Sequence, residues 1–292
     1  MRYDTVTFLS DYGRADEFVG VVHSVLRNFA PDARVIDLSH DIEPHDVRGA
    51  GLMLARAAPQ LAPGVVLGVV DPGVGTDRRG VAIEIGDGSS VLVGPDNGLF
   101  AHVVAMCGGP DRVVSLTNED FHLDSTSSTF DGRDVFAPVA AHLCQGVDLE
   151  EFGEVVDPGT MLPGTMPILT NEDHDLLAEV LWVDRFGNAQ LNMASTDLDP
   201  TTDTFGLVIK GRTRTVGLAG TFGDVAPGKV GLITDAHGLL ALVIQRGSAA
   251  EELELRTGSE VRISPLDKST GSPVGPTKVT LGPSVNRPGG DR

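Results

Sequence analysis

Residues 65–75 read VVLGVVDPGVG, an uninterrupted apolar run followed at once by an acidic, glycine-rich loop. A continuous apolar run of this length is typical of a strand that is buried on both faces of a sheet. In open α/β sheets, ligands bind in the loops that follow the carboxyl ends of the strands. The stretch therefore predicts the fold class of the first half of the chain and points to the loops where site residues should lie.

Before and after this strand in the sequence, segments with the hydrophobic period of a strand alternate with segments with the period of a helix. Further strands are expected at 5–9, 34–38, 81–85, 90–94 and 112–116. Helices are expected at 18–29, 47–58, 98–106 and 135–143, where apolar residues recur at helical spacing. Alternation of this kind predicts a mostly parallel α/β sheet with right-handed crossovers.

The pattern changes after residue 156. Residues 157–170 are rich in proline and glycine and are interpreted as a linker. Short strands with turn signals follow at 176–183, 189–193, 204–210, 213–219, 229–234, 239–245 and 260–263. We therefore predict an α/β protein with an N-terminal, mostly parallel α/β sheet domain (1–156) and an all-β, barrel-like C-terminal domain (171–264). Residues 265–292 are dense in proline, glycine and serine, and we expect a disordered tail there.

Composition narrows the functional classes. The 292 residues include 22 Lys and Arg against 41 Asp and Glu, a net charge of −19, which disfavours binding to nucleic acid or to anionic lipid. The two cysteines, Cys107 and Cys144, make neither a disulfide framework nor a zinc quartet. No apolar run approaches the roughly 18 residues of a membrane span, and the N-terminus carries no secretion-like pattern. We expect a cytoplasmic protein without a membrane partner.

Acidic or amide side chains follow four strands of the predicted sheet. The loops are Ser10-Asp11-Tyr12-Gly13, Ser39-His40-Asp41, Asp71-Pro72-Gly73-Val74-Gly75 and Gly94-Pro95-Asp96-Asn97-Gly98. One such loop is ordinary turn chemistry, but four along one edge favour a polar ligand site. None of them matches the glycine patterns of dinucleotide or triphosphate cradles.

Individual residues in these loops keep two interpretations open. Asp11 either caps the following helix or binds the hydroxyls of a ribose. Asp71 and Arg78 form either a surface ion pair worth under about 1 kcal/mol or a charged pair that orients a water molecule. Asp131 and Asp134 either cap the helix at 135–143 or bring a second carboxylate to the site.

The second domain carries an aromatic turn at 184–188, DRFGN. A hairpin with Gly187 at positive φ explains the turn structurally, yet Phe186 and Asn188 could also stack on and hydrogen-bond to an adenine. Phe222 offers a second exposed ring, and Trp182 is expected in the core. The chain lacks a Gly-x-Ser-x-Gly elbow. A metal site from His40, His45, Asp41, Asp46, Asp11 and Asp71 lacks ligand spacing, so we expect no metal.

Six motifs, taken in order, resemble a known family. FLSDYG, DPGVGTxRR, GPDNG, STFxGRDVFAP, VDRFGN and QRGSAAE occur as in the S-adenosyl-L-methionine (SAM) hydroxide adenosyltransferases, relatives of the 5′-fluoro- and 5′-chloro-adenosine synthases. The match covers about residues 4–262. The resemblance implies a homotrimer whose active site combines the first domain of one subunit with the second domain of its neighbour. It also implies attack of water or hydroxide on ribose C5′, giving adenosine and L-methionine, with no metal or cofactor.

The resemblance also implies roles for individual residues of this sequence. Asp71 and Arg78 match two members of a water-activating Asp–Arg–His set, and Asp131 stands where the family has the histidine. Asp11 matches the carboxylate that grips the ribose hydroxyls. The remaining predicted substrate-binding residues are Asn97, Asp184, Phe186, Asn188, Phe222, His237 and Arg246. Ala236 and His237 stand where the halogenases have a Ser–Arg pair for the methionine carboxylate, and Arg246 matches a position that meets adenine through its backbone.

Two other functions remain as alternatives. The fluoride enzyme has Tyr at the place of Asp71, Thr at Val74, Ser at Gly132 and a long insertion where this chain has the four-residue turn 86–89. A carboxylate at the reacting centre repels a halide but can hold water, so we favour hydroxide over halide. The second alternative is a protein that binds SAM or adenosine without turning it over. A metal-dependent phosphoesterase is disfavoured, because the family reaction should not respond to a chelator.

Overall fold

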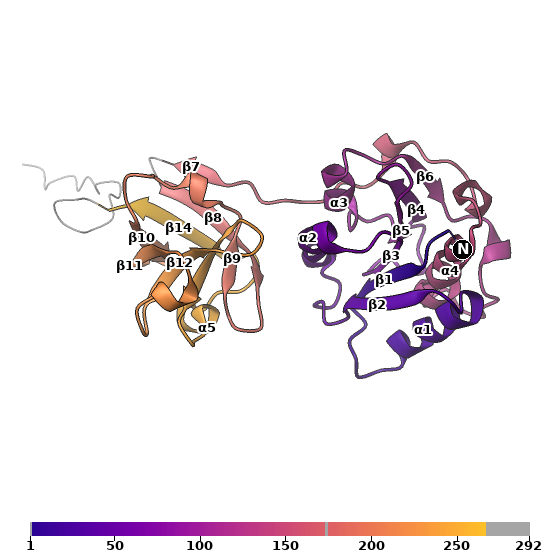
Figure 1. The fold of residues 1–292 in the computed structure, drawn as a ribbon, viewed down its shortest axis with the longest axis horizontal. Helices are drawn as coiled ribbons and strands as arrows, with labels where there is room; N and C mark the ends of the chain where they lie inside the picture. Colours follow the sequence, from indigo (N-terminus) through magenta and orange to yellow (C-terminus); the bar gives the residue numbers. More distant parts are fainter. Residues whose placement is uncertain (1, 173–174, 267–292) are drawn as a thin grey trace, which may run out of the picture. The chain divides into compact units, whose positions relative to one another are not determined.

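The computed structural model describes residues 2–172 and 175–266 of the chain (Figure 1). It divides into two compact units, Met1–Met166 and Pro167–Arg292. The division falls inside the proline- and glycine-rich stretch 157–170, whose regular structure before residue 170 is one 3₁₀ turn, Pro158–Thr160. Of the tail predicted at 265–292, residues 267–292 lie outside the described part, and Pro265 is the last residue of a strand.

The first unit is built on a six-stranded mixed sheet. Its strands are β1 (Thr5–Ser10), β2 (Arg34–Ser39), β3 (Val65–Val69), β4 (Gly80–Ile85), β5 (Ser90–Pro95) and β6 (Arg112–Ser115). Their order in the sheet is β2-β1-β3-β5-β4-β6. The four strands β2, β1, β3 and β5 are parallel neighbours, whereas β4 runs antiparallel to β5 and β6. The predicted α/β class and mostly parallel sheet are confirmed.

Helices cover both faces of this sheet. They are α1 (Phe18–Phe29), α2 (Val47–Ala57), α3 (Ala101–Met106) and α4 (Ala137–Gln145). Figure 1 shows α1 and α4 on one face and α2 and α3 on the other. The expected last helix begins differently, because Gly132–Phe136 forms a π-helical turn directly before α4. Such turns are uncommon and occur often at functional sites.

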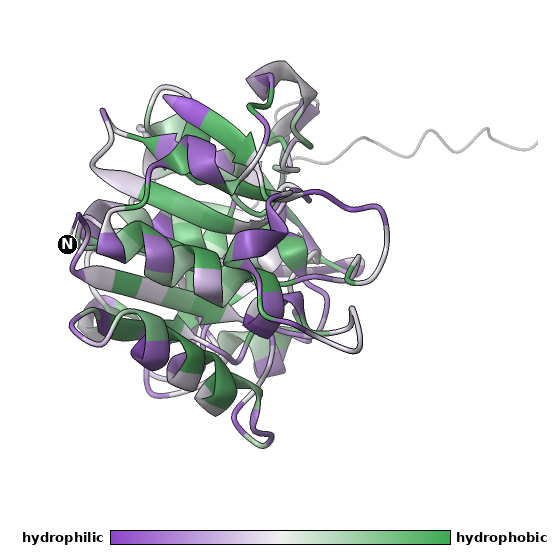
Figure 2. Ribbon diagram, turned by 90° about the vertical axis from the view of Figure 1, so that its right-hand side faces the viewer, coloured by the Kyte–Doolittle hydropathy of each residue, from purple (hydrophilic) through white to green (hydrophobic). Residues whose placement is uncertain are grey.

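Helix α1 shows why the sequence folds locally as it does. Val22, Val25 and Leu26 lie on one side of the helix and are buried against the sheet. Arg27 in the last turn suits the negative end of the helix dipole, and Pro31 follows where the helix has ended. In Figure 2 the surface helices show both hydrophobic and hydrophilic residues, whereas the strands are largely hydrophobic. Amphipathic helices packed on apolar strands therefore close both sides of the sheet.

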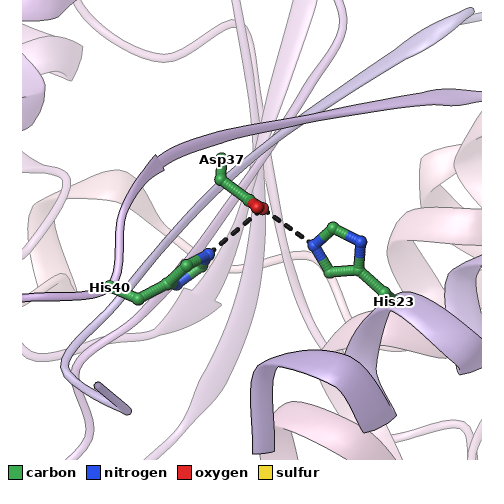
Figure 3. Close-up of side chains that lie close together, drawn as sticks. All are labelled: His23, Asp37 and His40. Carbon is green, nitrogen blue, oxygen red and sulfur yellow. Dashed lines mark hydrogen bonds and ion pairs between the residues drawn. The ribbon is translucent and has the colours of Figure 1, made fainter. Parts of the chain in front are cut away.

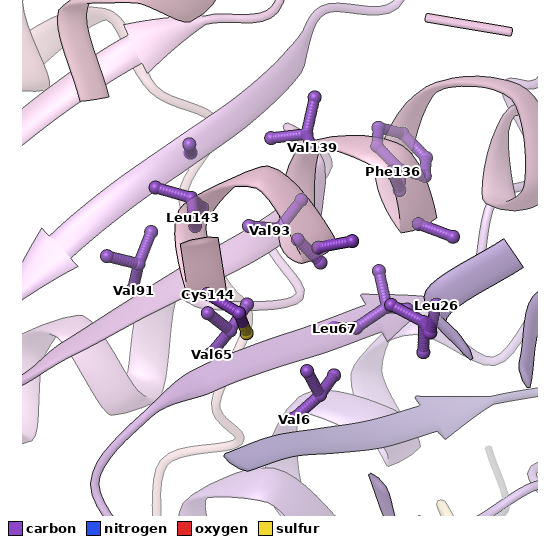
Figure 4. Packing of buried hydrophobic residues seen from close by; sticks show 14 of the residues in the cluster. Val6, Leu26, Val65, Leu67, Val91, Val93, Phe136, Val139, Leu143 and Cys144 are labelled. Atoms are coloured by element: carbon purple, nitrogen blue, oxygen red, sulfur yellow. The ribbon is translucent and has the colours of Figure 1, made fainter. Parts of the chain in front are cut away.

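Alternate residues of the central strands build two separate cores. Val6 and Phe8 of β1 pack with Val65 and Leu67 of β3 on the side of α1 and α4, as Figure 4 shows in part. Leu9, the next residue of β1, belongs to the core on the side of α2 and α3. Burying each of these large side chains contributes roughly 1.5–3 kcal/mol. This two-sided burial is the reason that residues 65–70 form a continuous apolar run.

The second unit is a closed β-barrel. Its strands are β7 (Thr170–Glu172), β8 (Asp175–Val183), β9 (Ala189–Leu191), β10 (Thr204–Ile209), β11 (Arg212–Ala219), β12 (Val230–Thr234), β13 (Leu240–Ile244) and β14 (Glu260–Pro265). Pairing of β14 with both β10 and β8 closes the ring, and β7 pairs with β8 outside it. The barrel-like second domain is confirmed. Two elements were not expected from the sequence, β7 and the short helix α5 (Ala249–Leu253).

Among the residues described, no helix combines the length and the apolar character that crossing a bilayer requires.

Candidate active site

The carboxyl ends of β2, β1, β3 and β5 form one continuous polar edge. Because these strands are parallel neighbours, the loops at 10–13, 39–41, 71–75 and 94–98 all leave the sheet on the same side. The polar edge expected from the strand-end loops is therefore present. It supplies candidate site residues from four elements that are far apart in the sequence.

Asp71, Arg78 and Asp131 form a buried ionic bridge at this edge. The Arg78 guanidinium donates to Asp71 through both Nε (3.0 Å to Oδ1) and Nη2 (2.6 Å to Oδ2). The same Nη2 donates to Asp131 Oδ2 at 2.6 Å. The three side chains are 6%, 10% and 20% exposed, so this is not a surface ion pair. A bidentate pair in this setting fixes the orientation of both groups.

Asp131 belongs to the bridge although it lies far from Asp71 and Arg78 in the sequence. It is the residue before the π-helical turn, yet its side chain makes no capping hydrogen bond. Its carboxylate binds Arg78 instead, 53 residues away in the chain. Asp134 is occupied separately by Arg133 (2.6 Å). Asp131 is therefore not a helix cap, and its carboxylate shares Arg78 with Asp71. A catalytic role for Asp131 stays a prediction.

Burial raises the pKa of Asp71 above its ordinary value. The Arg78 guanidinium acts in the opposite direction by stabilising the ionised form, and the negative charge of Asp131 adds to the rise. The carboxylate is therefore a stronger base than an exposed aspartate. Arg78 binds both oxygens of Asp71, and the loops of the polar edge lie around this pair.

Asp11 does not cap helix α1. Helix α1 begins at Phe18, and Asp11 Oδ2 accepts a hydrogen bond of 2.9 Å from the backbone N–H of His45 instead. His45 takes a positive φ of 68°, which an L-residue rarely adopts. The loop after β2 thus turns toward Asp11. The ribose role of Asp11 stays a prediction.

Tyr12 is a site residue that sequence analysis missed. Burial raises the pKa of its hydroxyl, and the charges of Asp11, Asp71 and Asp131 raise it further. Any Cβ at position 132 would collide with the Tyr12 hydroxyl oxygen, so Gly132 is required for this close approach. Tyr12 therefore remains a neutral hydroxyl among the carboxylates.

Asn97 is engaged within its own domain. Its Nδ2 donates to the carbonyl of Val70 (2.8 Å), and its Oδ1 accepts from the N–H of Leu99 (3.2 Å). The neighbouring Asp96 is buried in an ion pair with Arg79 (2.7 Å). The bond from Asn97 to Val70 ties the end of β5 to the end of β3, directly before Asp71. A direct role of Asn97 in substrate binding stays a prediction.

In the second unit, the turn between β8 and β9 is held by Asp184. Its Oδ1 accepts from the backbone N–H groups of Phe186 (2.8 Å) and Asn188 (2.9 Å), and its Oδ2 accepts from Asn188 Nδ2 (2.7 Å). Gly187 has φ 81°, and a Cβ there would collide with Ser248 at the start of α5. The turn is therefore rigid, and it leaves the Phe186 ring 73% exposed.

Two cavities open beside this turn. One, of about 760 Å³, is lined by Asp184, Phe186, Asn188, Phe222 and Arg246 together with the strand-end residues 244–247. The other, of about 440 Å³, shares Asp184, Asn188 and Phe222 and also reaches His237. The predicted residues of the second domain are therefore brought together. The Phe222 ring is 50% exposed, so both aromatic rings are free to stack on a flat ligand.

The second cavity contains three residues that the sequence did not single out for function. Trp182 is half-buried and lines it, so the expectation that Trp182 belongs to the core is wrong. Gln190 and Asp235 lie on the same wall and hydrogen-bond to each other. Gln190 is 2% exposed, and its Oε1 has no hydrogen-bond partner among the residues that the structure describes. This wall can therefore accept a further polar ligand group.

Both units resemble a known protein family. Residues 6–153 match the SAM hydroxide adenosyltransferase N-terminal domain, and residues 178–262 match the C-terminal domain of the same family. A protein of Salinispora tropica named (R)-S-adenosyl-L-methionine hydrolase is 42% identical over 89% of this chain and 97% of its own length. A fluorinase of Nocardia brasiliensis is 27% identical over 90% of this chain and 97% of its own.

The fold is also found in a solved structure. An uncharacterised conserved protein from Thermotoga maritima matches 88% of this chain and 99% of its own, with 32% identity and a TM-score of 0.80. The family models cover both units, and the hydrolase relative is more similar than the fluorinase. The chain belongs to the SAM hydroxide adenosyltransferase family.

Proposed function

We propose that this protein hydrolyses S-adenosyl-L-methionine to adenosine and L-methionine. The observation that carries the proposal is the buried Asp71–Arg78–Asp131 bridge at the carboxyl edge of the parallel strands. It supplies an oriented carboxylate of raised pKa where ligands bind in such sheets. Relatives that span most of the chain carry the name (R)-S-adenosyl-L-methionine hydrolase, which supports the same reaction.

The reaction is a displacement at the ribose C5′ carbon. The oxygen of a water molecule forms a bond to C5′ while the C5′–S bond breaks, and the bonding electrons go to sulfur. The sulfonium thereby becomes the neutral thioether of methionine, and the water gives up one proton. Positive charge on sulfur is lost as the new bond forms, and a site of low dielectric favours a transition state in which opposite charges approach. Holding the water in line with the C–S bond supplies a further large share of the rate.

Asp71 is the proposed acceptor of the water proton. A general base must be deprotonated at working pH, and it is more effective when its pKa lies closer to that pH. Burial of Asp71 provides such a shift, and Arg78 keeps the carboxylate ionised and correctly turned. A carboxylate there also disfavours a halide nucleophile through repulsion of like charges.

Asp131 is proposed to complete this charge arrangement. With both carboxylates ionised, the three side chains of the bridge carry a net charge of −1. The family's Asp–Arg–His set is neutral when its histidine is neutral, so this chain places more negative charge near the sulfonium. That charge attracts the cationic substrate and keeps the Asp71 pKa high.

Binding of the nucleoside is assigned to both units. Asp11 accepts the ribose hydroxyls, and Asn97 supports the loop beside Asp71. In the second unit, Phe186 and Phe222 stack on adenine, while Asp184 and Asn188 meet polar groups of the substrate. His237 is exposed on the adjoining cavity as a candidate for the methionine carboxylate, and the backbone at Arg246 faces the adenine. We propose no metal and no cofactor for the chemical step.

Replacing Phe186 by alanine is expected to weaken substrate binding. Stacking of a base on an aromatic ring contributes about 1–3 kcal/mol, so KM should rise roughly 5- to 150-fold with a smaller change in kcat. The Phe186→Tyr variant keeps a ring and should stay close to wild type. Steady-state kinetics of the three proteins with SAM checks this. Equal KM values for wild type and Phe186→Ala would remove adenine stacking from the assignment.

The reaction itself is tested by product analysis in isotopically labelled water. Incubation with SAM in ¹⁸O water should give adenosine and methionine in equal amounts, with the label in the 5′-hydroxyl of adenosine. Adding chloride should produce no 5′-chloro-adenosine, and adding EDTA should leave the rate unchanged. SAM that remains intact over hours would identify a binding protein. A chlorinated nucleoside would identify a halogenase, and label in any other product would exclude attack at C5′.

A further inference from the structure

Three side chains with metal-binding atoms converge beside the polar edge, outside the proposed catalytic set. His23 projects from α1, Asp37 from β2 and His40 from the loop that follows β2 (Figure 3). His23 Nε2 lies 2.8 Å and His40 Nε2 lies 3.1 Å from the same oxygen, Asp37 Oδ1. The three ligand atoms all lie within 4.8 Å of one another, and no other such group occurs in residues 2–172 and 175–266.

His40 supplies a second and independent observation. The side chain is 1% exposed, and its Nδ1 is engaged by Ser10 Oγ at 2.7 Å. Its Nε2 is buried but has no hydrogen bond of acceptable geometry, although Asp37 is near. The buried Nε2 of His40 thus faces the same carboxylate oxygen as Nε2 of His23.

The arrangement fits a first-row divalent metal ion. Two imidazole nitrogens and one carboxylate oxygen are a donor set that Zn²⁺ commonly uses. Bond lengths of about 2.0–2.1 Å in a tetrahedral site place ligand atoms roughly 3.3 Å apart, slightly more than the separations from Asp37 found here. The Ser10 hydroxyl holds the other nitrogen of His40, as outer-sphere partners of metal-bound histidines do.

Solvent can reach the cluster from one side. His23 and Asp37 are each 35% exposed, and His23 lines a cavity of about 440 Å³ together with Ser24 and Arg27. An ion can therefore enter, and a water molecule can occupy a fourth coordination position. The sequence did not suggest this group, because its members are separated by 14 and 3 positions and come from different elements.

We propose that His23, Asp37 and His40 bind one divalent transition-metal ion such as Zn²⁺ or Co²⁺. The ion would tie α1 to the carboxyl end of β2 and, through Ser10, to the end of β1 next to Asp11. Its role is to stabilise this corner of the first unit. None of the three ligands contacts the Asp71–Arg78–Asp131 bridge, so the chemical step does not pass through the metal.

The test is titration of the full-length, chelator-treated protein with Co²⁺. We expect one ion per chain, visible d–d absorption of a four-coordinate nitrogen- and oxygen-ligated ion, and a higher Tm when Co²⁺ or Zn²⁺ is present. His23→Ala and Asp37→Asn should each weaken Co²⁺ binding at least tenfold and abolish the rise in Tm. Both positions are partly exposed, so the variants should fold. His102→Ala and Asp41→Asn are the matched controls and should bind like wild type.

Several outcomes would overturn the proposal. Absence of saturable Co²⁺ binding, or binding that survives both His23→Ala and Asp37→Asn, would show that these residues form a hydrogen-bonded cluster only. Equal loss of binding in the two control variants would show that the effect is not specific to His23 and Asp37, which would remove them as the ligands. The turnover of SAM is measured on the same chelator-treated protein, so failure of the metal site leaves the proposed hydrolysis untouched.

Discussion

The Asp71→Asn variant should lose SAM hydrolysis, with kcat reduced about 10²- to 10⁴-fold, the usual contribution of a positioned general base. The amide keeps the shape of the carboxylate but cannot accept the proton that the attacking water releases. It also withdraws one of the two anionic partners of Arg78. KM should change less, because the groups assigned to adenine and ribose are unaffected. Methionine release at saturating SAM measures the effect.

The pH dependence of kcat/KM is a second test of Asp71 as the general base. Asp71 must be ionised to act as a base, so kcat/KM should fall as pH drops through its pKa. Burial raises that pKa, so the acidic limb should lie above the 3.8 of an ordinary aspartate. Asp131→Asn removes a neighbouring negative charge and frees Arg78 for Asp71 alone. The pKa of Asp71 should then decrease, and the acidic limb should move to lower pH.

The matched control is Asp77→Asn, the same substitution at an exposed position of the same loop. It should retain wild-type kinetics and the wild-type pH profile. If Asp71→Asn and Asp131→Asn both release methionine as fast as wild type, the buried bridge is structural and the base must lie elsewhere. If only Asp131→Asn is unaffected in rate and in pH profile, Asp71 and Arg78 suffice for activation of the water.

Much of the first domain could be predicted from the sequence, because periodicity reflects burial directly. The apolar run at 65–70 is buried on both sides, and the order of strands places four acidic loops on one edge. The Asp71–Arg78 pair could also be predicted from the sequence, since the two residues lie seven positions apart in one loop. For Asp131 the sequence left two roles open, a helix cap and a second carboxylate at the site, because a residue before a helix is an ordinary cap until its distant partner is known.

The missed residues share a physical reason. Tyr12 belongs to the site only because Gly132 permits its hydroxyl to approach, which is a contact across 120 positions of the chain. Trp182 lies two positions before Asp184 and therefore on the same face of the strand, so alternation places its ring beside the turn and not in the core. The ring accordingly lines the same cavity as Asp184. His23, Asp37 and His40 likewise meet only through packing of α1 on the sheet edge.

The proposed site takes residues from both units, so mixing subunits with different defects can test how the units combine. The acid–base residues belong to the unit Met1–Met166, whereas the aromatic residues Phe186 and Phe222 belong to Pro167–Arg292. We propose a homotrimer in which each catalytic centre uses the first unit of one subunit and the second unit of a neighbour. Two variants with complementary defects should then restore each other when their subunits are mixed.

The two variants are Asp71→Asn and the double variant Phe186→Ala, Phe222→Ala. Both aromatic rings are at least half exposed, so their removal should leave the barrel intact. Co-expression in equal amounts should give roughly a quarter of all centres with two wild-type halves, because each half is intact with a probability of about one half in a closed ring. Activity at low SAM should therefore exceed the mean of the parents many-fold.

A matched control places all three substitutions in one chain and mixes it with wild-type chain. If centres are shared by neighbours, this mixture should retain roughly a quarter of the wild-type activity, whereas centres built within single subunits would retain about half. Complementary variants that recover no activity, together with half activity in the control, would show that each subunit holds a complete centre. In that case the pairing of units proposed here is wrong, although Asp71 keeps its role, since its own variant tests that role independently.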